Sequence, residues 1–333
     1  MERITLAHGS GGKVMHELLN TCIVSRMGIN GMLTDSAILD INEGERIAYT
    51  TDSFVVSPLF FPGGNIGDLA VNGTVNDLSM MGALPKYLSV SYIIEEGLEM
   101  ELLETITDSV AAAANHAVVK IVTGDTKVVE KGKGDGIFIN TSGIGVLKDG
   151  LDIHPSRIKP GDRIIVNSSI GRHGVAVMSE RNGLSFEPQV LSDTSALNNL
   201  VEYMLSVTDG IHAMRDPTRG GLATTLKEIS TDIGLGISVD EKQIPVEAGV
   251  YGACELLGLD PLYVANEGVL VAFVENNVAD FLIEHIRKHP MGKGAFIIGE
   301  VINESPGVVF MKTGIGGTRI LDMLSGEQLP RIC

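Results

Sequence analysis

The sequence ends in a cysteine, whose side chain is the first candidate for chemistry. Cys333 closes the segment Pro330-Arg331-Ile332-Cys333, and the other two cysteines are Cys22 and Cys254. The thiolate is the nucleophilic form and the reference pKa of cysteine is roughly 8.5, so an exposed Cys333 can accept an acyl-type group near neutral pH. Alternatively, the chain simply happens to end in cysteine, because termini are often disordered and tolerant. The rest of the chain must decide between these two interpretations.

Acidic side chains form the second group of candidates. Four of them stand at expected turns and strand ends beside Thr, Ser or Gly: Asp35, Asp52, Asp125 and Asp216. An aspartate at a turn usually caps the local backbone, but carboxylates are also the ligands that Mg2+ uses when water and phosphate oxygens supply the others. Lys127 and Arg219 follow two of these aspartates and would neutralise phosphate charge. The pattern therefore favours a magnesium and phosphate site.

A helix expected from Ile66 to Met81 carries an unusual polar stripe. Asp68, Asn72 and Asn76 recur at i, i+4 and i+8, with Asp77 beside the last of them. Such a stripe can simply face solvent, but a surface helix normally uses Lys and Glu there, not short polar residues with poor helix propensity. The stripe therefore predicts a buried polar site on this helix.

The N-terminal segment His8-Gly9-Ser10-Gly11-Gly12-Lys13 combines a flexible backbone with a lysine. Glycine amides can converge on an anion, and Lys13 can add a positive charge. The segment does not fit the P-loop pattern, because Val14 stands where a Ser or Thr would hold magnesium. A mobile arm without a binding role is the alternative interpretation.

The elements that must position these residues alternate between strands and helices. In the first half we expect strands at 47–51, 87–95, 121–123 and 137–147, and helices at 66–81 and 102–114. A boundary rich in Pro, Gly and polar residues follows at 148–161. In the second half we expect strands at 163–167, 237–239, 262–265, 268–274, 296–301 and 307–312, and helices at 173–182, 194–206, 219–233 and 276–287. The best placed histidine, His173, begins one of these helices at a glycine-flanked turn.

This order of elements predicts an α/β (α+β) scaffold with two domains. We place the domains at residues 1–148 and 149–320, followed by a mobile tail at 321–333. In the tail, Gly326 would permit a hinge and Pro330 would stiffen the final reach. A thiol on a tail with few apolar anchors is badly placed for a core but well placed as a mobile carrier.

Composition limits the possible partners. The 333-residue chain has a formal net charge of −17, which argues against nucleic acid or an anionic membrane as a partner. The N-terminus does not resemble a signal peptide, and no apolar run approaches the roughly 20 residues of a membrane span. Three cysteines without CxxC spacing suggest neither a disulfide framework nor a zinc site. We therefore expect a soluble, cytoplasmic protein.

Several segments together resemble a known family. They are Thr51-Asp52-Ser53-Phe54, Asn76-Asp77-Leu78 with Met80-Met81-Gly82-Ala83, Gly124-Asp125-Thr126-Lys127-Val128, Asp216-Pro217-Thr218-Arg219-Gly220-Gly221 and Asn266-Glu267-Gly268. They are similar to the ATP-binding superfamily of aminoimidazole ribonucleotide synthetase, which also contains selenophosphate synthetase and thiamine-monophosphate kinase. Within it, the chain resembles end to end the carbamoyl dehydratase branch of hydrogenase maturation, whose members end in such a cysteine.

This resemblance implies an activity and its partners. The carbamoyltransferase HypF would place a carbamoyl group on the terminal cysteine, and ATP would drive its dehydration to a thiocyanate. The cyanide would then pass to iron held by the HypC–HypD complex, for assembly of nickel–iron hydrogenase. Because one placement of the thiol cannot serve both HypF outside the protein and ATP in a closed cleft, the tail is expected to move between two positions. The resemblance further implies two α/β domains, a homodimer built on the N-terminal domains, and ATP with Mg2+ in the cleft.

The resemblance also assigns roles to individual residues. Asp35, Asp77 and Asp216 would be magnesium ligands, and Lys13 and Lys127 would contact phosphates. The other nucleotide-binding residues would be Asp52, Asn76, Gly124, Asp125, Thr126 and Arg219. Glu267 is the candidate base, Lys127 would assist phosphoryl transfer, and Cys333 would carry the group into the cleft.

Two alternatives compete with this assignment. A selenophosphate synthetase would carry Cys or selenocysteine in its glycine-rich N-terminal loop, whereas residues 8–13 contain neither. A non-catalytic carrier would only deliver a thiol-bound group between partners. The intact set of acidic residues, lysine and Glu267 argues against such a carrier.

Overall fold

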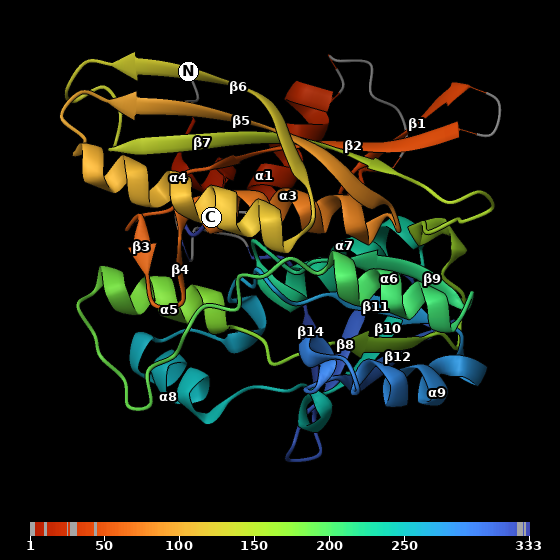
Figure 1. The fold of residues 1–333 in the computed structure, drawn as a ribbon. Coiled ribbons are helices and arrows are strands. Elements are labelled where there is room, and N and C mark those ends of the chain that lie inside the picture. The colour runs from red at the N-terminus through yellow and green to blue at the C-terminus, as the bar shows by residue number, and fades with distance from the viewer. Residues whose placement is uncertain are drawn as a thin grey trace.

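The computed structural model describes residues 4–9, 12–24, 26, 32–42, 45–324, 329 and 331–333. They form two mixed helix and sheet domains, and Figure 1 shows the first domain above the second. The predicted α/β fold class is confirmed. None of the helices in the described ranges has the length and apolarity needed to cross a bilayer.

The first domain is built on a five-stranded sheet. Its order is β1 (Ala37–Asn42), β2 (Glu45–Phe54), β7 (Ile137–Val146), β5 (Leu84–Glu95) and β6 (Lys120–Val129). Strands β5 and β6 run parallel and the other neighbours antiparallel. Helices α3 (Ile66–Met80) and α4 (Met100–His116) cover one face and lie between the sheet and the second domain (Figure 1). A short hairpin of β3 (Phe60–Phe61) and β4 (Gly64–Asn65) leads into α3, and helix α1 (Lys13–Leu18) lies near the N-terminus.

Helix α3 runs through the interior, which explains its composition. Its first turn is closed by a reciprocal pair: the Asn65 side chain accepts from Gly67 N (2.8 Å), and Asp68 Oδ1 accepts from Asn65 N (3.0 Å). Asn72 and Asn76 are both buried. The prediction of a buried polar stripe on this helix is confirmed for Asn72 and Asn76, whereas Asp68 is half-buried.

The second domain is built on a seven-stranded sheet. Its order is β14 (Thr318–Leu321), β13 (Val309–Lys312), β10 (Gly236–Asp240), β12 (Phe296–Ile302), β8 (Arg163–Val166), β11 (Val271–Val274) and β9 (Ile211–Arg215). Helices α6 (Asn198–Val207) and α9 (Asn276–Ile286) share an apolar cluster with Ile165 of β8, whereas α7 (Gly221–Ile233) shares one with Ile164. Because successive strand residues point to opposite faces, these helices cover opposite sides of the sheet. Helices α5 (Arg172–Arg181) and α8 (Ala248–Leu257) pack together beside the first domain.

Several elements differ from the sequence-based expectations. Strands β1 and β9 and helix α8 were not predicted, and β14 ends at Leu321, the first residue of the predicted tail. The strand expected at 262–265 is wrong: the 3-10 helix η5 (Pro261–Tyr263) stands there. Proline favours the first position of a helical turn, and Asp260 caps this one by accepting from Leu262 N at 3.0 Å.

A candidate active site between the two domains

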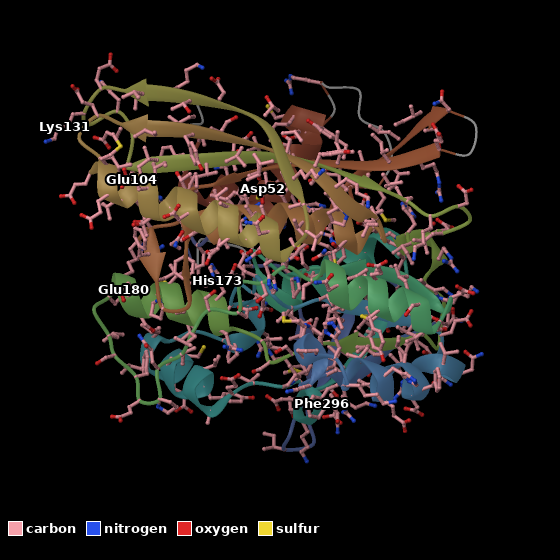
Figure 2. The ribbon with its side chains drawn as sticks, viewed as in Figure 1. Asp52, Glu104, Lys131, His173, Glu180 and Phe296 are labelled. Atoms are coloured by element: carbon pink, nitrogen blue, oxygen red, sulfur yellow. The ribbon has the colours of Figure 1, made fainter. Side chains whose placement is uncertain are left out.

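Side chains from both domains line one pocket of about 240 Å³. Strand β2 and helix α3 contribute from the first domain, and the loops after β9 and before β11 contribute from the second. Figure 2 labels Asp52 in this region, beneath the five-stranded sheet. The lining residues are Asp35, Thr50, Thr51, Asp52, Gly73, Asp77, Arg215, Asp216, Thr218, Arg219, Glu267 and Cys333. The fold therefore brings together seven predicted site residues from distant parts of the chain.

The pleat of β2 and one turn of α3 position the first-domain residues. Thr50 and Asp52 are two residues apart in β2 and so share the face that packs on α3. The Thr50 hydroxyl donates a hydrogen bond to Asp77 Oδ2 at 2.8 Å. Gly73 lies one turn before Asp77, and a Cβ at this position would come within 3.0 Å of the Phe54 ring and 4.0 Å of Asp52 Oδ2. Glycine thus keeps space open beside the two carboxylates.

The carboxylates of the pocket repel one another in a buried setting. Burial raises the pKa of Asp35 to about 8, against the opposing charge of Arg215 and with the help of Asp216. The pKa of Asp77 lies well above its ordinary value because of burial and the neighbouring Asp216 and Asp52. Burial likewise raises the pKa values of Asp52 and Asp216. The pocket therefore lacks the positive charge that would balance its buried carboxylates.

Two buried carboxylate oxygens of the pocket have no hydrogen-bond partner, Asp35 Oδ2 and Glu267 Oε1. The other oxygen of Asp35 pairs with Arg215 Nε at 2.6 Å. Within the described residues, no three His, Cys, Asp or Glu side chains are grouped so that they could hold a metal ion by themselves. The arrangement suits a cation that takes its remaining ligands from water or a bound phosphate.

Glu267 lies on a loop whose backbone is fixed by hydrogen bonds. The carboxyl group of Glu267 itself has no such partner at Oε1. Asp193 Oδ2 accepts from Glu267 N (3.1 Å) and from Gly268 N (2.8 Å). On the preceding residue, Asn266 Oδ1 accepts from Gly171 N at 2.6 Å. Burial and nearby carboxylates raise the pKa of Glu267 well above its ordinary value. A carboxyl with a raised pKa can accept and hold a proton near neutral pH.

The Cys333 thiol lies inside the pocket, with the residue only 7% exposed. Arg219 Nη1 donates to its sulfur at 3.1 Å. Burial raises the pKa of the thiol to about 12, although Arg219 opposes this shift. The expectation of an exposed thiol is wrong for this conformation, because Leu329 and Ile332 are buried and anchor the segment.

Four predicted nucleotide-binding residues lie within strand β6, not at a turn. Gly124, Asp125, Thr126 and Lys127 pair with residues 90–93 of β5. The predicted turn is wrong because backbone pairing with β5 overrides the local turn preference of Gly and Asp. Lys127 forms an ion pair with Asp125, and both side chains are more than half exposed. None of the four is among the described residues that line the pocket of this chain.

Two further predicted ligands lie outside the pocket. Lys13 begins α1 with an exposed side chain, and its backbone N donates to Leu324 O at 3.1 Å. Asn76 Nδ2 donates to Ser195 O (3.0 Å) and Glu267 O (3.2 Å), so this side chain joins the domains and supports the Glu267 loop. The predicted anion-binding residues Ser10 and Gly11, and the tail residues Gly326 and Pro330, lie outside the described residues.

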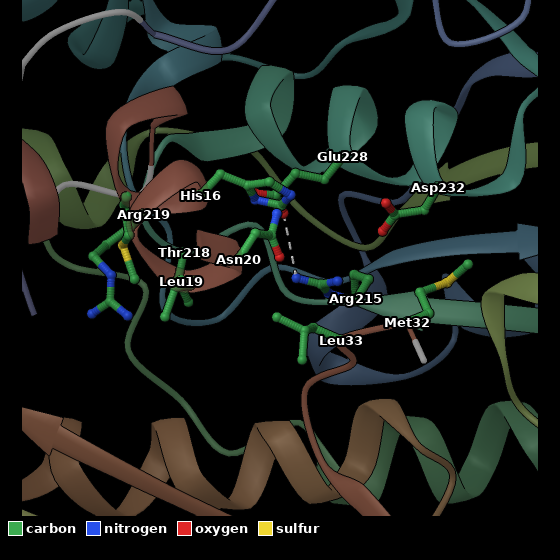
Figure 3. Close-up of a pocket in the computed structure, with 11 residues that line it drawn as sticks. His16, Leu19, Asn20, Met32, Leu33, Arg215, Thr218, Arg219, Glu228 and Asp232 are labelled. Atoms are coloured by element: carbon green, nitrogen blue, oxygen red, sulfur yellow. Dashed lines mark ion pairs between the residues drawn. The ribbon is translucent and has the colours of Figure 1, made fainter. Parts of the chain in front are cut away.

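A second pocket, of about 280 Å³, adjoins the first and shares Arg215, Thr218 and Arg219 with it (Figure 3). Its other lining residues mix apolar and polar side chains: Met15, His16, Leu19, Asn20, Met32, Leu33, Glu228 and Asp232. Arg215 Nη2 pairs with Glu228 Oε2 at 3.6 Å on this side. Thr50, Arg215 and Thr218 were not predicted as site residues, although each lies within two residues of a predicted aspartate.

Comparisons with known proteins cover both domains. The N-terminal domain model of AIR synthase related proteins matches residues 33–147, and the C-terminal domain model matches residues 159–312. The carbamoyl dehydratase HypE of Bradyrhizobium diazoefficiens is 51% identical over 333 residues, which cover 99% of this chain and 96% of the relative.

Two solved structures resemble this chain closely. A crystal structure of a HypE–HypF complex matches with a TM-score of 0.87 and 46% identity, covering 94% of this chain and 100% of the other. A crystal structure of HypE in complex with ATP matches with a TM-score of 0.84 and 45% identity, covering 99% and 100%.

Proposed function

Because this chain belongs to the HypE family of carbamoyl dehydratases, we propose that it dehydrates a carbamoyl group carried on its own Cys333 thiol. It is an ATP-dependent dehydratase of hydrogenase maturation. The observation that carries the proposal is the position of Cys333, whose sulfur lies beside Arg219 in the same pocket as five carboxylates.

The reaction converts a thiocarbamate, S–C(=O)–NH2, to a thiocyanate, S–C≡N. The carbonyl oxygen is a poor leaving group, so transfer of the γ-phosphoryl group of ATP to this oxygen turns it into a phosphate ester. Elimination then breaks the C–O bond and requires removal of both nitrogen protons. The products are thiocyanate, ADP and phosphate, and the oxygen of the lost water ends in the phosphate.

Glu267 is the proposed base for these protons. Its carboxyl lines the pocket that holds the Cys333 sulfur, and its Oε1 atom has no hydrogen-bond partner. The raised pKa of Glu267 supports this role, since it lets the carboxyl hold a proton after taking it from nitrogen. Arg219 faces the sulfur and would hold the thiocarbamate in place.

The proposed magnesium ligands are Asp35, Asp77 and Asp216. Their support is the unpartnered Asp35 Oδ2, together with the burial that raises the pKa of each of the three carboxyls and the repulsion by neighbouring carboxylates that adds to it. Mg2+ bound here would neutralise charge on the transferred phosphoryl group. We place the nucleoside in the adjoining pocket of Figure 3, which shares Arg215 and Arg219 with the reaction pocket.

The same thiol must occupy two positions. In the pocket its pKa is raised to about 12 and its residue is 7% exposed, so it is protonated and out of reach of a donor enzyme. We therefore propose that the tail swings out to receive the carbamoyl group from HypF, with which a relative forms a complex. A HypC–HypD complex would accept the cyanide, and the cytoplasm would be the setting for both transfers.

We also propose a homodimer through the open face of the five-stranded sheet. Exposed apolar side chains gather on that face: Leu39, Tyr49, Tyr87, Ile93, Ile144 and Val146. Ile144 pairs with both Tyr49 and Tyr87, so these three form a continuous row. An exposed patch of this kind usually marks an interface. Lys127 pairs in register with Ile93 and lies on the same face of the sheet. We therefore propose that Lys127 of one protomer acts in the active site of the other.

Ile144→Glu is expected to convert the dimer to a monomer, because it places a charge at the centre of the apolar row. Size-exclusion chromatography with light scattering should show the molar mass fall by half, and dehydration should slow at least tenfold if Lys127 acts across the interface. Met100→Glu is the control, since Met100 is 68% exposed at the start of α4, away from the sheet face. A wild-type protein that is monomeric at all concentrations would contradict the proposal.

Intact-mass analysis tests the reaction itself. The chain is incubated with the carbamoyltransferase, carbamoyl phosphate and ATP with Mg2+. We expect a mass gain of one carbamoyl group at Cys333, followed by the loss of one water, and the carbamoyl form should persist when a non-hydrolysable ATP analogue replaces ATP. A carbamoyl adduct that never loses water in the presence of ATP would leave only a carrier function.

A further inference from the structure

The last three residues of the sequence are bound along two backbone positions of the first domain. Val55 N donates to Cys333 O (3.1 Å), and Ser57 N donates to Arg331 O (3.2 Å), so two carbonyls of the segment each accept one backbone hydrogen bond from the first domain. Ile332 is 2% exposed within an apolar cluster that spans both domains. Backbone hydrogen bonds of this kind can form with almost any sequence. They therefore do not by themselves determine where the thiol lies.

His173, in the first turn of α5, meets this segment from the second domain. Its Nε2 atom lies 2.8 Å from Ile332 O, and because a carbonyl only accepts, Nε2 must carry the hydrogen. Its Nδ1 atom lies 2.8 Å from Ser192 Oγ, which also accepts from Thr194 N (3.1 Å). Burial disfavours a charged ring, and a neutral ring with its hydrogen on Nε2 has none on Nδ1, so the Ser192 hydroxyl donates to Nδ1. The ring is fully buried and edge-on to Phe61 (5.3 Å between centroids). The contacts therefore define one neutral tautomer and one ring orientation.

The place of His173 is linked to the loop that carries the proposed base. Gly171, two residues earlier, donates its N–H to Asn266 Oδ1 at 2.6 Å. Asn266 directly precedes Glu267. Burial lowers the pKa of His173 in spite of the nearby Asp193, in agreement with a neutral ring. The segment that carries the thiol and the loop that carries the base are thus held relative to each other.

Arg331 is held by side chains from both domains. Its φ angle is +50°, in the left-handed region that non-glycine residues adopt only where their surroundings require it. The guanidinium pairs with Asp135 of the β6–β7 loop and donates from Nε to Val55 O at 2.9 Å. Arg181, at the end of α5, donates to Arg331 O at 2.8 Å and to Ser57 O at 2.5 Å. The two guanidinium contacts, with Asp135 and Val55 O, favour an arginine at this position.

We propose that His173 is a positioning residue for the dehydration, a role that rests on the proposed function. The imidazole fixes the Ile332 carbonyl and thereby keeps the Cys333 sulfur 3.1 Å from Arg219 Nη1. Arg181 and Asp135 complete a docking site for the Arg-Ile-Cys segment. Carbamoyl transfer takes place with the thiol outside this site and does not use it.

Thiol alkylation measures docking without any turnover. In a Cys22→Ser background the exposed competing thiol is gone, and Cys254 is buried with its pKa raised to about 11 by burial. We expect His173→Ala to speed alkylation of Cys333 by a maleimide at least tenfold. His173→Gln should react nearly as slowly as the parent, because its amide N–H can still donate to the Ile332 carbonyl. His212→Gln is the matched control, a buried histidine of the same domain that contacts Asp162 and not the segment.

Single-turnover assays complete the test. Dehydration should slow at least tenfold in His173→Ala and recover in His173→Gln, while carbamoyl transfer by the carbamoyltransferase stays unchanged in both. Should His173→Ala fail to fold, Ser192→Ala keeps the ring but removes its Nδ1 partner, and we expect a smaller change in the same direction. Equal alkylation and dehydration rates in the alanine and glutamine variants would overturn the positioning role. If wild type never loses water from its carbamoyl adduct, the proposed function fails, whereas the alkylation result still stands for the docking site.

Discussion

Replacing Cys333 with alanine is expected to abolish both carbamoyl acceptance and thiocyanate formation, while ATP binding persists. The two other thiols cannot substitute for it. Cys254 is buried, with a pKa raised to about 11 by burial, and Cys22 is not among the residues that line the pocket. Intact-mass analysis after incubation with the carbamoyltransferase, carbamoyl phosphate and ATP should show no added group. Calorimetric titration with ATP and Mg2+ should give an affinity close to that of the parent.

Cys22→Ser and Cys254→Ser are the matched controls for this experiment. The first removes an exposed thiol and the second a buried one, and both leave Cys333 beside Arg219. Each variant should therefore gain the carbamoyl group and lose water as the parent does. A carbamoyl group found on Cys22 or Cys254 in the Cys333→Ala variant would show that the carrier has been misassigned.

Helix α3 illustrates how much of the site a local pattern can predict. The i, i+4 and i+8 spacing of Asp68, Asn72 and Asn76 indicated a buried polar face, since a helical period places such residues on one side. The same pattern could not identify the partners of these side chains. Asn72 Nδ2 donates to Thr194 Oγ1 (3.1 Å) and Asn76 Nδ2 to Ser195 O (3.0 Å), more than 100 residues away. The polar stripe of α3 therefore lies at the contact between the two domains, beside the pocket.

Strand β6 shows why local composition misleads. A glycine next to an aspartate is typical of a turn, but it also suits a close approach of two strands. A Cβ at Gly124 would come within 2.2 Å of Val90 O, so the pairing with β5 excludes a larger side chain here. Sequence spacing cannot distinguish the two explanations, because the contact that decides between them is made by a strand 34 positions earlier in the chain.

The segment with Cys333 could not be placed from its sequence for a related reason. Its few apolar residues suggested a free tail, yet Ile332 is buried by residues whose positions in the chain are remote from it. His173 contacts the Ile332 carbonyl across a separation of 159 residues. Individual reactive side chains could be predicted from the sequence. The docking site could not, because it forms only when both domains are folded and in contact.

Replacing Asp77 with asparagine is expected to slow dehydration by about 100-fold or more, because it removes a preorganised charge that would meet the transferred phosphoryl group. Acceptance of the carbamoyl group should be unchanged, since the thiol is proposed to receive it outside the pocket. The substitution is nearly isosteric, and the Thr50 hydroxyl that donates to Asp77 Oδ2 can donate to the amide oxygen instead. Intact-mass analysis should therefore find a carbamoyl adduct that accumulates. Normal formation of thiocyanate would rule out Asp77 as a magnesium ligand.

The same variant is expected to be more stable than the parent without nucleotide, and increasingly so as pH rises. Burial and neighbouring carboxylates raise the folded-state pKa of Asp77 well above the unfolded value of about 4, so the parent loses stability as pH rises through the interval between them. Asparagine does not ionise and escapes this loss. The melting temperature of the variant should exceed that of the parent by more at pH 8 than at pH 6, whereas Asp108→Asn, on the exposed face of α4, should change neither value. With ATP and Mg2+ present the order should reverse at pH 8, because only the aspartate gains a bound cation. A variant that melts below the parent at pH 8 without nucleotide would mean that Asp77 is already stabilised in its charged form. The carboxylate cluster would then carry no uncompensated negative charge for a metal ion to neutralise.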